Sequence, residues 1–202
     1  MNNRSNPAVE YGTDQIVANI RAMRAEATEE NVRDGRAWYP GMLSVMAAHA
    51  NDTGLSVAQC AAVYAACSIN TGWAQNLRNG AGALADFAAG REPFASGGTL
   101  GMIIDKVRRI IAGEDIDATL SADPNNLKIR SFTRNMSGNY DAVTVDRWAM
   151  RVAYATIDNG YVPTGAEYQT IADAYRTVAA EFGETPADTQ AITWCVIRGT
   201  GE

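Results

Sequence analysis

Lys128 and Asp146, in the second half of the chain, combine a nucleophilic amine with a carboxylate at a separation of eighteen positions. A lysine amine acts as a nucleophile when burial or a neighbouring cation lowers its pKa. A carboxylate can accept a proton or stabilise developing positive charge. Lys128 is one of only two lysines beside fifteen arginines. The spacing alone is common in proteins, and Asp146 is equally consistent with a structural residue near the N-terminus of a helix.

The residues around this pair resemble the helix-hairpin-helix DNA glycosylases, the superfamily of endonuclease III and 8-oxoguanine glycosylase. In that family a lysine opens a helix, and an aspartate follows eighteen residues later in a Val-Asp-x-His-Val-x-Arg pattern. Residues 145–151 read Val-Asp-Arg-Trp-Ala-Met-Arg, which keeps the valine, the aspartate and the arginine and places Trp148 at the histidine position. The resemblance covers about residues 55–155. It implies that Lys128 attacks the sugar carbon as a Schiff-base nucleophile and that Asp146 stabilises the sugar cation.

A second match lies upstream, where residues 65–76 are similar to the Ser-x-Gln/Asn helix junction of the same family. In the family a polar amide fills the space left by a base that has been extruded from the duplex. The resemblance implies that Asn70 is this wedge, with Ser68 and Trp73 beside the DNA. The alternative is that Asn70 caps a helix.

Basic residues concentrate between positions 128 and 151, a stretch that contains five basic residues and only two acids, Asp141 and Asp146. The candidate DNA-binding residues in this stretch are Arg130, Arg134, Arg147, Trp148 and Arg151. A smaller basic cluster consists of Lys106, Arg108 and Arg109. The net charge of −6 does not fit a protein that coats nucleic acid non-specifically. The alternatives are a local positive face on an acidic body and two ordinary solvated helix faces, with Trp148 in the core.

Besides Trp148, the sequence departs from the family at two points. The hairpin Leu-Pro-Gly-Val-Gly should precede the lysine, but residues 121–127 read Ser-Ala-Asp-Pro-Asn-Asn-Leu and offer no glycine pair to a phosphate. The family's iron–sulfur cysteine quartet is missing, so no cluster is expected. No other cofactor is predicted either. The compact size and altered hairpin resemble a phage-encoded branch related to thymine-hypermodification enzymes, which implies a small-molecule cosubstrate.

Three functions follow as hypotheses. The first is an enzyme that acts on a base in DNA, by cleaving its N-glycosidic bond with an accompanying Schiff-base lyase step. The second is base hypermodification on a modified thymine. The third is a phage protein that binds DNA or protein without catalysis, and a helical structural or assembly protein with no site is the remaining alternative.

Helical periodicity runs through the whole chain and predicts one all-α domain, residues 1–202, of about nine or ten helices with a central cleft. A glycosylase-like core would span about residues 55–155, with the C-terminal helices of 164–198 packing on it. Capping boxes at Ser56 and Thr164 and the Thr185-Pro186 pair mark three helix starts. The small residues after Ser56 predict a helix near the centre of the bundle.

The remaining helix boundaries are predicted from breaks in the pattern. The helical pattern is interrupted near Gly35 and Pro40. A second interruption separates a helix that reaches about Asn79 from another over residues 81–89. Further helices are predicted from residues 123–124 to about 136, and from 144 to 158.

The three cysteines are too few and too badly spaced for a disulfide framework, so free thiols are expected. The only histidine, His49, has no cysteine or carboxylate at ligand spacing, and no metal is expected. No apolar run is long enough to cross a bilayer, and residues 1–10 do not read as a signal peptide. The default expectation is a cytoplasmic protein, in the host cytoplasm if phage-encoded.

Overall fold

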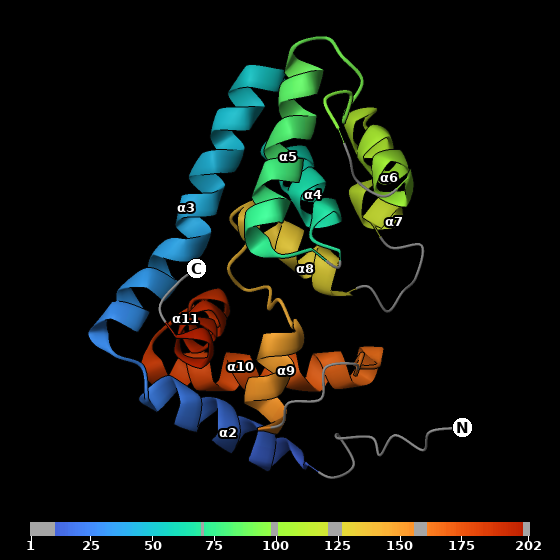
Figure 1. Ribbon diagram of the computed structural model, residues 1–202. Coiled ribbons are helices and arrows are strands. Elements are labelled where there is room, and N and C mark those ends of the chain that lie inside the picture. The colour runs from blue at the N-terminus through green and yellow to red at the C-terminus, as the bar shows by residue number, and fades with distance from the viewer. Residues whose placement is uncertain (1–10, 70, 98–100, 121–126, 156–160, 200–202) are drawn as a thin grey trace. The chain divides into compact units, whose positions relative to one another are not determined.

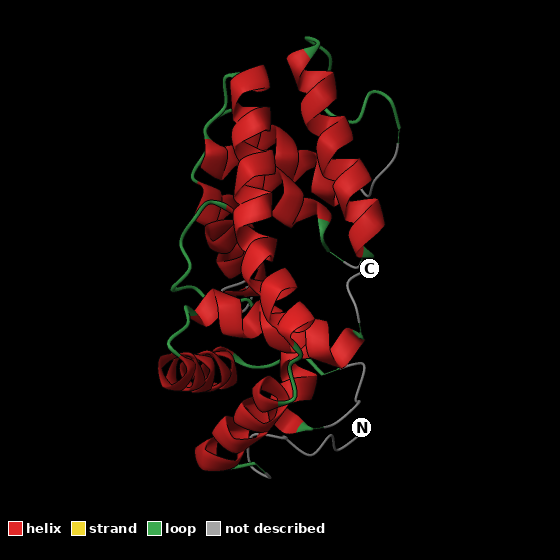
Figure 2. Cartoon of the chain, turned by 90° about the vertical axis from the view of Figure 1, so that its left-hand side faces the viewer, coloured by secondary structure: helices red, strands yellow, loops and turns green. Residues whose placement is uncertain are grey.

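The computed structural model describes residues 11–69, 71–97, 101–120, 127–155 and 161–199. These residues form ten helices and no strand, which confirms the all-α prediction (Figures 1 and 2). The chain divides into two compact units, the first formed by Met1–Tyr39 and Tyr140–Glu202 and the second by Pro40–Asn139. The predicted core of residues 55–155 crosses the second boundary between them.

The first unit is built from both ends of the chain. Its helices are α2 (Thr13–Ala25), residues 29–39 of α3 (Glu29–Thr53), α9 (Arg147–Tyr154), α10 (Gly165–Phe182) and α11 (Pro186–Arg198). Helix α2 packs on α9, α10 and α11, and α11 also packs on α9 and α10. Buried side chains such as Ile16, Ile20, Ile171 and Tyr175 form its core. The predicted capping box at Thr164 opens α10, and Thr185 opens α11 with Pro186 in its first turn.

The second unit is arranged around α4 (Val57–Cys67). This helix contacts α5 (Trp73–Ala88), α6 (Gly101–Ile111), α7 (Ile116–Leu120) and α8 (Leu127–Met136). Every residue from 60 to 67 is buried, and small alanine side chains let the neighbouring helices approach closely. The predicted capping box at Ser56 begins α4. The prediction that this helix lies near the centre of its bundle is therefore confirmed.

Two of the predicted helix ends are wrong, because the glycines at these positions allow a neighbouring residue to pack closely and do not end the helix. Helix α3 continues through Gly35 and Pro40, and a Cβ atom at Gly35 would lie 2.7 Å from the backbone N and Cα atoms of Ile192. Helix α5 likewise continues where two helices were predicted, and a Cβ atom at Gly80 would lie 2.7 Å from the Tyr64 ring. In both places tertiary contact outweighs the low helix propensity of glycine.

The predicted helix boundaries around the candidate site also shift. Helix α9 begins at Arg147, later than residue 144, and Tyr154 is its last residue because Ala155 turns left-handed with φ 49°. The predicted extension to residue 158 lies outside the described residues, as does the predicted start of α8 at residues 123–124. The short helix α7 was not predicted, since five residues are too few for a recognisable period.

Cys60, Cys67 and Cys195 are free and buried, and burial raises the pKa of Cys67 to about 12. His49 hydrogen bonds through Nε2 to the Tyr64 hydroxyl at 2.9 Å. Within the described ranges, no three His, Cys, Asp or Glu side chains gather where they could hold a metal ion.

A membrane-spanning helix needs both length and hydrophobicity. None of the helices formed by the described residues has enough of the two to cross a bilayer.

Candidate nucleic-acid interface

Asp146 occupies the N-cap position of α9, at the start of a helix as predicted. Its Oδ1 atom accepts hydrogen bonds from the backbone N–H groups of Trp148, at 2.9 Å, and Ala149, at 2.8 Å. These two groups have no partner within the helix, and the positive end of the helix dipole favours the anionic carboxylate. The cap fixes where α9 begins, and thereby which way its side chains project.

Trp148 is the centre of a group of stacked side chains from α9 and α11. The guanidinium carbons of Arg151, Arg147 and Arg198 lie 4.3, 5.4 and 5.5 Å from the centroid of its ring. The same Arg198 guanidinium lies 4.8 Å from the Trp194 ring. We call Arg147, Trp148, Arg151, Trp194 and Arg198 the Arg–Trp cluster, and all five belong to the first unit.

The Arg–Trp cluster concentrates positive charge. Three guanidinium groups around one ring repel one another, while each gains about 0.5–1 kcal/mol from its cation–π contact at a site open to solvent. Among the described residues, the ion pairs involve neither Arg147 nor Arg198. Arg147 is exposed, and Trp148, Arg151 and Arg198 are half-buried. The arrangement suits an anionic ligand that also has a flat face to stack.

The other predicted basic residues are matched with acids inside the second unit. Asp117 of α7 forms ion pairs with Arg130, at 2.7 Å, and Arg134, at 2.9 Å. The hydrogen bond from Arg130 and the charges of both arginines hold the pKa of Asp117 below its usual value.

Two residues of the smaller predicted cluster are matched in the same way, because Arg108 pairs with Glu92 and Arg109 with Glu114, while the Lys106 amine donates to the Leu120 carbonyl at 3.4 Å. The basic stretch seen in the sequence is thus divided. Arg130 and Arg134 on α8 pair with Asp117, whereas Arg147 on α9 forms no ion pair with a described acid.

The two candidate catalytic residues belong to different units. Lys128 lies in α8 of the second unit, and Asp146 lies at the start of α9 in the first. Ser68 follows the last turn of α4, where its hydroxyl donates to the Ala65 carbonyl at 2.7 Å. Trp73 opens α5, and its ring meets the edge of Phe132 at a centroid distance of 6.3 Å. The predicted wedge, Asn70, lies outside the described residues.

Trp194 and Arg198 were not among the predicted binding residues, although the sequence carries a signal for them. They stand four positions apart on the last helix, which places them on one face. Trp148 and Arg151 repeat the same aromatic–basic pairing at three positions. Trp38 of α3 extends the aromatic contacts, with its ring 6.3 Å from that of Trp194.

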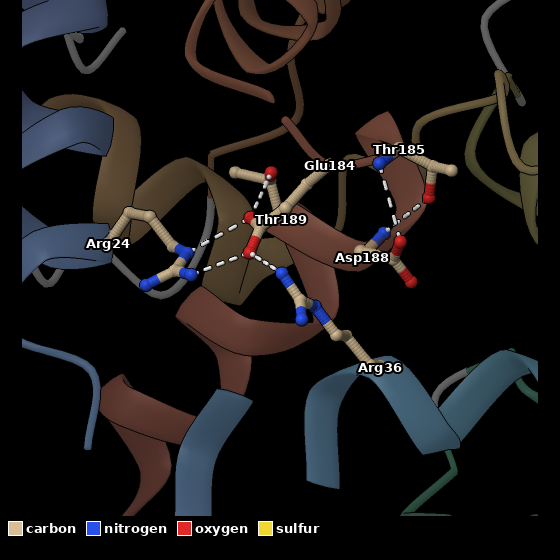
Figure 3. Close-up of polar contacts among 6 residues, drawn as sticks. All are labelled: Arg24, Arg36, Glu184, Thr185, Asp188 and Thr189. Carbon is tan, nitrogen blue, oxygen red and sulfur yellow. Dashed lines mark hydrogen bonds and ion pairs between the residues drawn. The ribbon is translucent and has the colours of Figure 1, made fainter. Parts of the chain in front are cut away.

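The carboxylate of Glu184, between α10 and α11, is a fully buried charge in the first unit (Figure 3). Its Oε1 accepts from Arg24 at 2.5 Å and from Arg36 at 3.1 Å, and its Oε2 accepts from Arg24 at 3.0 Å and from Thr189 at 2.9 Å. The Arg24 guanidinium also stacks on the Phe182 ring at 4.7 Å. With two partners on each oxygen, Glu184 ties α2, α3 and α11 together and serves structure.

Opposing effects set the pKa of Glu184. Burial alone would raise it, but the hydrogen bonds from Arg24 and Thr189, the charge of Arg24 and the bond from Arg36 outweigh burial. The pKa of Glu184 therefore lies below its usual value.

The profile of a family of unknown function, DUF7178, matches residues 2–201. No curated protein and no solved structure matches the chain.

Proposed function

The chain belongs to this family of unknown function, and we propose that it binds nucleic acid through the Arg–Trp cluster of α9 and α11. The observation that carries the proposal is the gathering of three guanidinium groups around the Trp148 ring. Guanidinium groups form strong, often bidentate hydrogen bonds with phosphate oxygens. Indole and guanidinium planes are also surfaces on which bases stack.

The acidic body of the protein is compatible with such a site. A net charge of −6 opposes binding along the whole surface and leaves attraction to a local cationic patch. A nucleotide could make two kinds of contact here, because its phosphate would pair with the arginines and its base would stack on Trp148 or Trp194. An anion without a base would use only the arginines.

The salt dependence of binding tests this proposal. With three phosphate contacts, the logarithm of the association constant for a labelled oligonucleotide should fall against log[salt] with a slope of about −2 to −3. Arg198→Gln should weaken binding and reduce the slope by about one contact, and Arg147→Gln should do the same. Fluorescence anisotropy of the full chain at several salt concentrations measures both quantities.

Arg108→Gln is the matched control, because it changes the net charge by the same amount but removes an arginine that is paired with Glu92. It should leave affinity and slope nearly unchanged. Equal losses in Arg108→Gln and Arg198→Gln would mean that overall charge, and not the Arg–Trp cluster, governs binding. No salt-dependent binding by the wild type would overturn the proposal outright.

Base excision is the second candidate function, favoured by the Asp146 carboxylate at the head of the helix that carries the cluster. In a lyase reaction the Lys128 amine condenses with the C1′ aldehyde of an abasic site and releases water, and borohydride reduces the resulting imine to a stable amine. The wild type should therefore become covalently attached to abasic-site DNA. Denaturing gel electrophoresis after borohydride treatment detects the adduct.

The chain contains its own control for this reaction. Lys128→Ala should abolish the adduct, whereas Lys106→Ala, which removes the only other lysine, should retain it. An adduct that persists in Lys128→Ala contradicts the assigned role. DNA that binds without any adduct would favour base modification or binding without catalysis.

A further inference from the structure

The loop that leads into α9 is held by a buried tyrosine of α10. The Tyr168 hydroxyl donates to the Val143 carbonyl at 2.7 Å and accepts from the Val145 N–H at 3.0 Å. Tyr168, Val143 and Val145 are all buried. One hydroxyl group thus satisfies two backbone groups that flank Thr144, and these groups would be costly to leave unpaired away from water.

Thr144 is fixed as well. Its side chain is buried and lies near the hydroxyl of Tyr39, which donates to Gln190 of α11 at 2.9 Å. The Thr144 carbonyl accepts from the Asp146 N–H at 3.1 Å. The backbone from Val143 to Asp146, which leads to the N-cap of α9, is therefore held in place by these hydrogen bonds.

We propose that Tyr168 is a positioning residue for the Arg–Trp cluster. By holding the loop at Val143 and Val145, its hydroxyl sets Asp146 in place as the cap, and the cap directs Trp148 toward Arg198 of α11. This inference rests on the proposed nucleic-acid binding for its functional consequence. Its structural consequence, an ordered first turn of α9, can be measured without any ligand.

Tyr168→Phe tests the role of the hydroxyl, because the ring is kept and only the two backbone hydrogen bonds are lost. The amides of Trp148 and Ala149, which the Asp146 cap protects, should exchange with solvent about five- to tenfold faster, as expected for a lost cap. Oligonucleotide affinity should fall by a similar factor. Hydrogen exchange followed by NMR and fluorescence anisotropy on the full chain give the two readouts.

Tyr175→Phe is the matched control. Tyr175 is another buried tyrosine on α10, but its hydroxyl bonds to the Thr193 hydroxyl of α11 at 3.2 Å, whereas that of Tyr168 bonds to the loop before α9. A general loss of stability should appear in both variants. Faster exchange confined to Trp148 and Ala149, with weaker binding, should appear in Tyr168→Phe alone.

Each outcome bears on a different claim. Unchanged exchange at the two amides in Tyr168→Phe overturns the positioning role, whether or not the protein binds DNA. If exchange is faster in Tyr168→Phe but the wild type binds no nucleic acid, the positioning role of Tyr168 stands and the proposed function is refuted. Faster exchange with unweakened binding overturns the link between the two. If Tyr168→Phe does not fold, Asp146→Ala removes the cap directly and must weaken binding for the inference to hold.

Discussion

Replacing Glu184 by glutamine should destabilise the first unit by about 3 kcal/mol, because removing one partner of a buried ion pair leaves the other charge without compensation. The Glu184 side chain is fully buried and that of Arg24 is 9% exposed, so water cannot replace the lost carboxylate. Glutamine keeps the volume of the side chain, and the effect therefore reports charge and hydrogen bonding. Urea denaturation followed by tryptophan fluorescence measures it, since Trp38, Trp148 and Trp194 all belong to the first unit.

Glu181→Gln supplies the control on the same helix. Glu181 pairs with Arg21, and both side chains are well exposed. Solvent screens such a pair, and its loss should shift the urea midpoint much less than the loss of Glu184. Equal shifts in the two variants would show that burial of the Glu184 carboxylate contributes nothing.

The lowered pKa of Glu184 also gives the sign of a pH effect on the same variant. A carboxyl group whose folded-state pKa lies below its unfolded value of about 4.3 stabilises the fold above that pH. The contribution is lost as the pH falls through the folded-state pKa. The difference in unfolding free energy between wild type and Glu184→Gln should therefore narrow below about pH 4.

Gly35→Ala should destabilise the first unit by about 2 kcal/mol. The new methyl group would lie 2.5 Å from Cγ1 and 2.7 Å from the backbone N and Cα of Ile192, so α3 and α11 must move apart. Overpacking of this kind costs about 3 kcal/mol when backbone has to shift. The better helix propensity of alanine returns about 1 kcal/mol.

Gly41→Ala separates these two contributions. Gly41 lies on the same helix, is exposed, and has no described heavy atom within 4 Å of an added Cβ. Only the gain in helix propensity remains there, and the variant should be more stable than wild type by up to about 1 kcal/mol. A stabilised or neutral Gly35→Ala would contradict the close approach of α3 and α11.

Local chemistry made much of the fold predictable from the sequence. The boxes at Ser56 and Thr164 and the proline after Thr185 satisfy backbone groups within a few residues, and each begins a helix in the structure. Gly35 and Gly80 misled the prediction because their role depends on Ile192 and Tyr64, which are distant in sequence. A glycine that breaks a helix and one that admits a neighbour look the same in a single sequence.

The same division applies to the candidate site. The place of Asp146 at a helix start follows from local sequence, and the structure shows it as the cap of α9. The contact between Trp148 and Arg198 depends on how α9 packs on α11, which residue spacing does not encode. The pairing of Arg130 and Arg134 with Asp117 is likewise a tertiary contact. It offsets part of the positive charge that the sequence had suggested for DNA binding.

The interleaved order of the two units dictates a sequence of events on the ribosome. Pro40–Asn139 emerges as one uninterrupted stretch and can fold before Tyr140–Glu202 has been synthesised. The apolar side chains of Ile16 and Ile20 on α2 stay uncovered until helices such as α10 have been synthesised. The contact between α2 and α10 then closes a loop that contains the whole second unit. The first unit, with the Arg–Trp cluster, is completed only after α10 and α11 have left the ribosome, so the proposed binding surface forms after the whole second unit has been synthesised.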